Sequence, residues 1–359
     1  MEKKFLGSDM DEKRAFMALS RVKGLNRLAK RLICDAYSDI TGIFGPPHND
    51  TEFMPPGISA RFSDWKGINA DLKALDKLGA RVITLRDADY PPLLKHIPDA
   101  PVVLYARGPL KAGQDTIAIV GSRKASTEGI IISGKIGETV SSTGITVVSG
   151  LARGIDTAAH CNALHGTGKT VAVLGCGIDI CYPPENKGLF ENIAREGLLV
   201  TEYAPGQRPM PHHFPERNRI IAGISRGVLV VEATAKSGSL ITARLALEYG
   251  REVMAMPGSV LKTEHAGSNR LIKDGARLVD SVEDVLITCF PHIQPEIKKP
   301  VELDSSENKV YSLIGFEKIH ADEVIERSGM DTKDVRATLT RLAMRNIITE
   351  APGGFFVRA

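Results

Sequence analysis

Short, continuously apolar segments alternate with longer helical stretches between Thr116 and about residue 290. The apolar segments are rich in β-branched residues, which is typical of strands that are covered on both faces. Helical stretches of roughly 10–20 residues lie between most of them. This alternation predicts an α/β fold with a doubly wound, extended Rossmann-type parallel sheet. The predicted strands span residues 116–120, 145–149, 170–175, 198–203, 227–232, 252–256 and 276–279.

The chain before this region contains two smaller patterns. Residues 15–37 repeat apolar positions at helical spacing around a break at Lys23-Gly24, which predicts a helical module over residues 1–50. The module resembles the sterile-alpha-motif and helix-hairpin-helix units of DNA-handling proteins, and a small bundle with a solvated basic face explains the pattern equally well. Pro and Gly predict a linker over residues 51–68. A helix near 69–78 and two strands then extend the sheet, so the main domain is expected to span 69–290.

The C-terminal region has a different order of elements. Residues 291–304 contain three prolines and no periodicity, which predicts a linker. Residues 305–359 predict helices at about 306–314, 320–328 and 332–345, then a strand, a Pro-Gly-Gly turn and a second strand. This order is typical of a winged-helix module. The module is neutral overall, so we do not expect it to bind duplex DNA tightly by itself; protein docking and an auxiliary DNA role both stay open.

Composition narrows the class of protein. The chain of 359 residues has no run approaching the ~18 apolar residues of a membrane span, and its N-terminus lacks the apolar core of a signal peptide. Five cysteines without paired spacing are typical of a reducing compartment, so we expect a cytoplasmic protein without membrane contact. Residues 115–290 hold 18 basic and 18 acidic residues and are therefore neutral. A polyanion would have to bind in a local pocket, because no basic surface is available.

Three of the predicted strands end in turns that suit anion binding. In a doubly wound sheet these turns expose backbone N–H groups and helix N-termini at one edge. Gly lets the backbone approach a phosphate, and Arg can hold one through two hydrogen bonds. One such turn alone is weak evidence, since Gly often marks only a tight turn, but three at the same edge favour a phosphate site. The residues in question are Gly121, Ser122, Arg123, Ser149, Gly150, Gly154, Lys236, Ser237, Gly238 and Ser239.

A fourth element, residues 211–223, combines an aromatic ring with cations. Phe214 offers a face on which a nucleic-acid base can stack, and such stacking tolerates any base. Arg217, Asn218 and Arg219 follow it closely. The alternative is a charged loop that caps a helix, with Phe214 in the core. The segment by itself does not decide between the two.

Together these segments resemble the DNA-processing protein A family, also called DprA or Smf. The similarity covers nearly all of residues 70–290 and is carried, in order, by IAIVGSRKAS, VVSGLARGIDTAAH, TVAVLGCGIDICYPPEN, FPERNRIIAGIS, AKSGSLITARLALEYGREVMAMPG and GSNRLIKDGA. The resemblance implies a non-enzymatic protein that binds single-stranded DNA without sequence preference, protects it during DNA uptake and helps load the RecA recombinase, usually as a homodimer. It assigns phosphate contacts to Gly121, Ser122, Arg123, the Ser149–Gly154 turn, Arg217, Asn218, Arg219, Lys236 and the Ser237–Ser239 turn.

The main alternative is a nucleotide-processing enzyme. The crevice also resembles that of lysine-decarboxylase-like phosphoribohydrolases, whose signature is PGGxGTxxE, but SGSLITARLALE lacks the paired glycines and places Glu248 too far along. We expect His160 to be a buried histidine and Asp156 to stabilise a helix N-terminus. The chain contains no GxGxxG or Walker A motif, so we expect no nucleotide cofactor. Cys176 and Cys181 lack the second pair of ligands that a zinc site needs, so we expect no metal.

Overall fold

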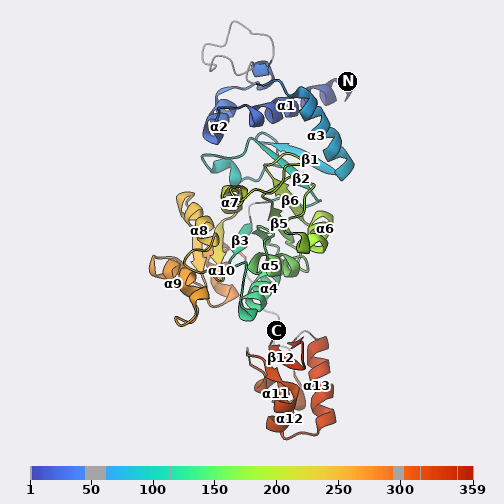
Figure 1. The fold of residues 1–359 in the computed structure, drawn as a ribbon, viewed down its shortest axis with the longest axis vertical. Coiled ribbons are helices and arrows are strands. Elements are labelled where there is room, and N and C mark those ends of the chain that lie inside the picture. Colours follow the sequence, from blue (N-terminus) through green and yellow to red (C-terminus); the bar gives the residue numbers. More distant parts are fainter. Residues whose placement is uncertain are drawn as a thin grey trace. The chain divides into compact units, whose positions relative to one another are not determined.

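The computed structural model describes residues 2–44, 62–113, 115–293, 303–315, 317–345 and 347–358. The chain divides into two compact units, Met1–Gln294 and Pro295–Ala359 (Figure 1). Within the described residues, no helix is long and apolar enough to cross a membrane.

The first unit begins with the predicted helical module. Helix α1 spans Glu2–Arg21 and helix α2 spans Arg27–Ala36, and a short 3₁₀ turn, η1, follows at Thr41–Phe44. The break falls at Gly24, whose φ of 81° is easily adopted only by glycine. Asn26 caps α2 by accepting a hydrogen bond from the backbone of Ala29. Buried residues of α1 belong to the same hydrophobic core as the first two strands of the sheet, so the module and the sheet domain fold as one unit.

Helix α3, Trp65–Leu78, begins earlier than the sequence predicts. The Asp64 side chain caps it by accepting from the backbone N–H of Gly67, and Gly79 ends it in the left-handed conformation. Residues 65–68 of the predicted linker are therefore helical. The cap at Asp64 starts the helix directly after the Pro- and Gly-containing segment that predicts a linker. Residues 51–61 of the predicted linker lie outside the described residues.

A nine-stranded sheet forms the centre of the first unit, with the strand order β1-β2-β6-β5-β4-β3-β7-β8-β9. Strands β3 to β9 pair in parallel, whereas β1 and β2 extend the sheet in antiparallel fashion beside β6. The predicted doubly wound parallel sheet is thus confirmed. The strands are β1 Ala80–Thr84, β2 Val103–Arg107, β3 Thr116–Val120, β4 Thr146–Ser149, β5 Thr170–Val173, β6 Leu198–Thr201, β7 Gly227–Val230, β8 Glu252–Ala255 and β9 Arg277–Leu278.

Helices cover both faces of the parallel part of the sheet. Apolar residues of α4, α5 and α10 form one hydrophobic cluster with one set of strand side chains, and residues of α6, α7 and α8 join the core on the other face. Consecutive residues of β3 alternate between the two clusters, as the two-residue period of a strand requires. The helices are α4 Thr127–Ser142, α5 Ile155–Ala163, α6 Lys187–Glu196, α7 His213–Ile224, α8 Ser239–Glu248, α9 Ala266–Lys273 and α10 Val282–Cys289.

The second unit has the predicted winged-helix architecture. A three-stranded sheet of order β10-β12-β11 packs with three helices around a core that includes Val310, Val335, Leu339 and Phe356. Gly353 and Gly354, both with positive φ, form the turn between the last two strands. The elements are α11 Ser305–Leu313, β10 Ile319–His320, α12 Ala321–Ser328, α13 Thr332–Met344, β11 Ile348–Ala351 and β12 Phe355–Arg358. Residues 294–302 of the predicted linker lie outside the described residues.

Candidate functional site

A pocket of about 470 Å³ opens where the strand order reverses, at the carboxyl ends of β3 and β7. The chain leaves β3 towards β4 on one side, while β7 pairs with β3 on the other, so the turns after both strands diverge and leave a crevice. The site residues that the sequence predicts and that line this pocket are Gly121, Ser122, Arg123, Phe214, Arg217, Asn218, Ser237, Gly238 and Ser239.

The turn after β3 brings backbone and an exposed cation to the pocket. A Cβ atom on Gly121 would lie 2.6 Å from Cγ1 of Ile155, so this turn requires glycine. The backbone N–H of Ser122 donates to the carbonyl of Glu232 at 2.7 Å, which fixes the turn against the end of β7. Arg123 is exposed, and its guanidinium lies 5.4 Å from the ring centroid of Phe214. A cation stacked on a ring combines phosphate binding and base stacking at one position.

Arg217 is buried in the wall of the pocket with only part of its guanidinium bonded. Its Nη2 donates to the carbonyl of Gly150 at 2.8 Å, while Nε and Nη1 have no hydrogen-bond partner within the described residues. A Cβ atom on Gly150 would lie 1.6 Å from Nη1, so the guanidinium fits only against glycine. Burial, partly offset by the charge of Asp156, lowers the pKa of Arg217 to about 10. The group therefore stays charged at neutral pH and has donors left over for an anion.

Two further features complete the pocket. Phe214 is partly exposed and lies 5.3 Å from the ring of Tyr182, a residue that sequence reasoning did not single out. The N-terminal turn of α8 presents Ser237 and Ser239, whose hydroxyls lie 2.7 Å apart. Asn218 donates to the carbonyl of Gly238 at 3.3 Å and so joins α7 to this turn. A helix N-terminus that carries hydroxyl groups is a general anion-binding arrangement.

Four predicted residues stay outside the pocket lining but next to it. Lys236 is exposed on the turn before α8. Ser149 is buried, and its hydroxyl donates to the carbonyl of Ile119 at 2.6 Å. Gly150 packs against Arg217, as described above. Gly154 has φ 74°, and a Cβ atom there would lie 2.3 Å from the carbonyl oxygen of Ser122. Ser149, Gly150 and Gly154 therefore shape the pocket from behind.

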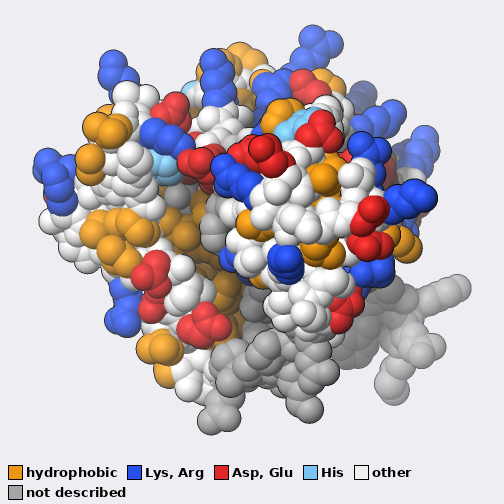
Figure 2. Space-filling view, turned by 90° about the horizontal axis from the view of Figure 1, so that it is seen from below, with side chains coloured by type: hydrophobic (Ala, Val, Ile, Leu, Met, Phe, Trp, Pro, Cys, Tyr) orange, Lys and Arg blue, Asp and Glu red, His pale blue; other side chains and the backbone are white. Residues whose placement is uncertain are grey.

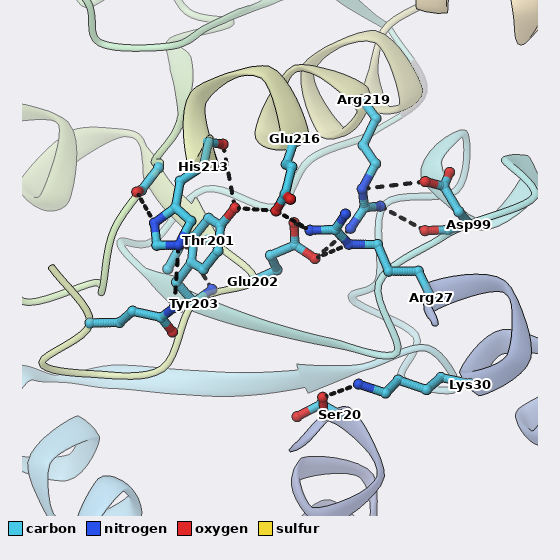
Figure 3. Close-up of polar contacts among 12 residues, drawn as sticks. Ser20, Arg27, Lys30, Asp99, Thr201, Glu202, Tyr203, His213, Glu216 and Arg219 are labelled. Atoms are coloured by element: carbon cyan, nitrogen blue, oxygen red, sulfur yellow. Dashed lines mark hydrogen bonds and ion pairs between the residues drawn. The ribbon is translucent and has the colours of Figure 1, made fainter. Parts of the chain in front are cut away.

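The structure places Arg219 away from this pocket, contrary to our expectation. Its side chain lies on the opposite side of α7, where it pairs with the carboxylate of Glu202 and donates to the carbonyl of Asp99 at 2.7 Å (Figure 3). Residues that are two apart on an α-helix point about 200° away from each other. Arg217 and Arg219, which are two apart on α7, therefore cannot face the same site. The opposite directions of Arg217 and Arg219 follow from the helical conformation of residues 213–224, which the sequence pattern did not establish.

His160 lies behind the pocket and Asp156 lies in its wall, and both have structural roles. The Nδ1 atom of His160 lies 2.6 Å from the hydroxyl of Thr170, and Nε2 accepts from the backbone of Leu151 at 3.3 Å. Burial, together with the charge of Arg217, lowers the pKa of His160 to about 3, so the imidazole is neutral. The Asp156 carboxylate accepts from the backbone of Gly150 at 3.1 Å. Both residues hold the turn after β4, which confirms that His160 is a buried histidine.

Neither a metal site nor the alternative hydrolase arrangement is found in the described part of the chain. No group of three or more His, Cys, Asp or Glu side chains is placed there to hold a metal ion. Glu248 is the last residue of α8, at the end opposite the pocket, and it pairs with Arg244. The carboxylate of the phosphoribohydrolase signature therefore has no counterpart on this helix near the pocket.

Comparison with known proteins identifies the family. Residues 81–289 match the model of the DNA recombination-mediator protein A family, and residues 294–354 match the DprA winged helix domain. The chain belongs to the DNA recombination-mediator protein A family. The resemblance to DprA and Smf proteins is confirmed, and DNA processing in recombination is the role that this family membership supports.

Members of the family from several bacteria are similar to this chain. Protein Smf of Synechocystis is 36% identical over 311 residues, covering 76% of this chain and 78% of the relative. DNA processing protein DprA of Streptococcus pneumoniae is 48% identical over 204 residues, covering 56% and 72%. Among solved structures, DprA from S. pneumoniae superimposes with a TM-score of 0.57 at 36% identity, covering 77% of this chain and 92% of that one.

A second solved structure concerns a family member described with its ligand. DNA processing protein A from Helicobacter pylori matches with a TM-score of 0.54 at 28% identity, covering 60% of this chain and 98% of that one. The study of that protein describes its single-stranded DNA binding mode.

Charged side chains of both signs are mixed on one face of the molecule. On the face drawn in Figure 2, Lys and Arg side chains lie interspersed with Asp and Glu, without a broad basic field. Residues 115–290, which lie in the first unit, carry equal numbers of basic and acidic residues. An anion site in this unit must depend on a few placed groups.

Proposed function

We propose that this protein is a non-enzymatic mediator that binds single-stranded DNA without sequence preference in the pocket at the ends of β3 and β7. The observation that carries the proposal is the pairing of exposed Arg123, stacked on Phe214, with buried Arg217, whose Nε and Nη1 atoms have no partner within the described residues. The described binding of single-stranded DNA by the H. pylori relative supports it.

The arrangement suits a flexible strand better than a duplex. Phosphates would lie against Arg123, the free edge of Arg217 and the N-terminal turn of α8, while Lys236 adds charge at the rim. A base beside them would stack on Phe214. Unpaired bases are available for such stacking, whereas those of a duplex are already stacked and paired. Because stacking and phosphate contacts do not read base edges, binding would be indifferent to sequence.

Three finer proposals accompany the family resemblance. The protein would help load the RecA recombinase onto the bound strand during DNA uptake and recombination, in the cytoplasm. It would act as a homodimer, so that two pockets on one assembly bind a longer strand with greater avidity. The winged-helix unit would dock a protein or assist DNA binding.

Fluorescence anisotropy tests the proposal. A labelled oligo-dT strand and the matched duplex are titrated with the full chain at two salt concentrations. We expect a clear preference for the single strand, affinity that falls with salt, and an oligonucleotide that stays intact. Affinity should rise steeply once the strand is long enough to reach two pockets. A flat dependence on strand length would contradict the dimer, and equal binding to the duplex would contradict the function itself.

Arg123→Ala locates the site. Loss of a charge-assisted phosphate contact should weaken binding by about 1.5–3 kcal/mol and reduce the salt dependence by close to one phosphate contact. Arg195→Ala is the matched control, because Arg195 is an exposed residue of α6 that pairs with its neighbour Glu196 and lies outside the pocket. Unchanged binding by Arg123→Ala would remove the pocket from the proposal.

A further inference from the structure

Helix α7 separates two cavities of the first unit. Phe214, Arg217 and Asn218 face the proposed DNA pocket. Glu216, from the same two turns, faces a second cavity of about 440 Å³ whose other wall is formed by the N-terminal helices α1 and α2, from Ser20 to Lys30. A change in the position of α7 at either cavity therefore reaches the other through one rigid element.

Arg27, the first residue of α2, bonds directly to α7. Its Nη2 donates to Glu216 at 2.6 Å and to Glu202 at 3.2 Å, and its Nε donates to Glu202 at 3.3 Å (Figure 3). Glu202, which follows β6, also binds Arg219 of α7. The guanidinium of Arg27 thus joins the N-terminal module to the end of strand β6 and to helix α7, which faces the proposed DNA pocket.

The same network holds the first turn of α7. The hydroxyl of Tyr203 lies 3.2 Å from the Glu216 carboxylate and 3.3 Å from the backbone carbonyl of His213. The His213 ring stacks on Tyr203 with ring centroids 4.0 Å apart, and its Nδ1 lies 3.1 Å from the carbonyl of Gly175. Phe214 lies between these two anchored residues. Its position, and that of Arg123 stacked on it, therefore depends on the network.

The charges of the network are matched and partly shielded from water. Arg27 and Arg219 face Glu202, Glu216 and Asp99, and the side chain of Glu202 is only 12% exposed. Burial lowers the pKa of Arg27, but the two glutamates outweigh this effect and raise it. Both guanidinium groups are thus paired with carboxylates, while Lys30, which also lines the second cavity, donates to the backbone carbonyl of Ser20. The arrangement is suited to holding elements together.

We propose that Arg27 is a positioning residue for α7, through which the N-terminal helices set the affinity of the pocket for single-stranded DNA. This inference rests on the proposed function. Arg27 does not line the DNA pocket and would act on DNA only through Glu216 and Glu202. The N-terminal module thereby becomes part of the binding apparatus without touching the strand.

The test compares Arg27→Ala with Arg31→Ala in the oligo-dT titration. Arg31 is the matched control, because it lies on the same helix and donates to the carbonyl of Lys95, so it also ties α2 to the sheet domain, but not through α7. We expect Arg27→Ala to weaken binding about tenfold, a typical size for coupling between sites. Arg31→Ala should bind like the wild type, and Arg27→Lys should recover part of the loss.

Salt dependence separates positioning from direct contact. The slope of affinity against salt counts neutralised phosphates, so Arg27→Ala should keep the slope of the wild type, whereas Arg123→Ala should lose part of it. Glu216→Gln alone should weaken binding, and in the Arg27→Ala background it should add little, since both changes break the same link. Thermal unfolding of each variant shows whether it is folded; if Arg27→Ala is not, Glu216→Gln replaces it in the comparison.

Each outcome bears on one of the two proposals. Normal binding by Arg27→Ala, or a loss of slope equal to that of Arg123→Ala, or an equal loss in Arg31→Ala, would overturn the positioning role. If Arg123→Ala loses binding while Arg27→Ala does not, the proposed function stands and only this inference fails. A wild type that does not prefer single strands would remove both.

Discussion

The two sides of α7 carry arginines that are buried to the same degree and used differently. Arg217 is 3% exposed and Arg219 is 4% exposed. Arg219 forms ion pairs with Glu202 and Asp99 that hold the helix against the rest of the fold, although its Nε makes no hydrogen bond within the described residues. Arg217 has one hydrogen bond to a backbone carbonyl, and two of its nitrogens have no partner among the described residues.

This difference shows how a buried cation can be recognised as a binding group. A buried charge is costly unless it is paired and hydrogen-bonded. Where carboxylates of the protein pair the charge, as Glu202 and Asp99 do for Arg219, the residue contributes to structure. Where the protein leaves donors free beside a pocket, as for Arg217, an anionic ligand can complete the set. Charge or burial alone would not separate the two.

The largest expected effect is a loss of folding stability when Arg219, the ion-paired arginine of α7, is replaced. Arg219→Met should lower the free energy of unfolding by about 3 kcal/mol, because Glu202 loses a buried partner. The value is at the lower end for such pairs, since Arg27 still faces Glu202. Urea unfolding measures it. Arg244→Met is the control: Arg244 is 72% exposed and pairs with Glu248 one turn away, so its loss should change stability by about 0.5 kcal/mol or less. Equal losses in the two variants would contradict the comparison.

A smaller effect on stability is expected from the buried, neutral imidazole of His160. His160 stays unprotonated in the folded chain down to about pH 3, whereas an ordinary histidine takes up a proton near pH 6.5. Below pH 6.5 the unfolded chain therefore binds a proton that the folded chain excludes, and stability falls as the pH falls. Between pH 7 and pH 5 the loss should be about 2 kcal/mol.

Urea unfolding at pH 7 and pH 5 checks this, with His160→Gln as the comparison. The variant lacks the titrating ring, so its stability should decrease less than that of the wild type over the same interval. The same decrease in both proteins would show that other groups cause it.

The smallest effect is expected from Phe214, on the DNA side of α7. Phe214→Leu keeps apolar volume against Tyr182 but removes the stacking face, so single-strand affinity should fall by about 1 kcal/mol. Phe214→Tyr keeps the face and should bind like the wild type. Anisotropy with oligo-dT measures both. If the leucine variant binds as well as the tyrosine variant, no base stacks on this ring.

Much of the fold could be predicted from the sequence, because the strands are buried on both faces and must be continuously apolar. Ile117 to Val120, for example, alternate between two cores, and no polar residue could serve there. Strand ends were less predictable. Val231 continues the apolar pattern of β7 but lies beyond its end, and the carbonyl of the following residue, Glu232, accepts from the backbone N–H of Ser122. Such endings depend on contacts with another strand.

The candidate site was only partly accessible to the same reasoning. The glycines after β3 and β4 and the α8 turn could be selected, because each follows directly from a strand end. Tyr182 could not, because it lies far from Phe214 in the sequence and meets it only in the folded chain. Arg27 gave no signal either, since its partners Glu202 and Glu216 are about 180 residues away.

By itself the sequence determined the order of elements, the parallel sheet, the winged helix and the turns where an anion would bind, since these follow from local periodicity and from Gly at strand ends. The tertiary structure decided which charged groups are free. In the folded chain Arg217 bonds only to a backbone carbonyl, whereas Arg219 pairs with Glu202 and Arg27 bonds to Glu216 of α7. Local sequence patterns determine where helices, strands and turns form. The pairing of a buried charge depends instead on groups that folding brings together from distant parts of the chain.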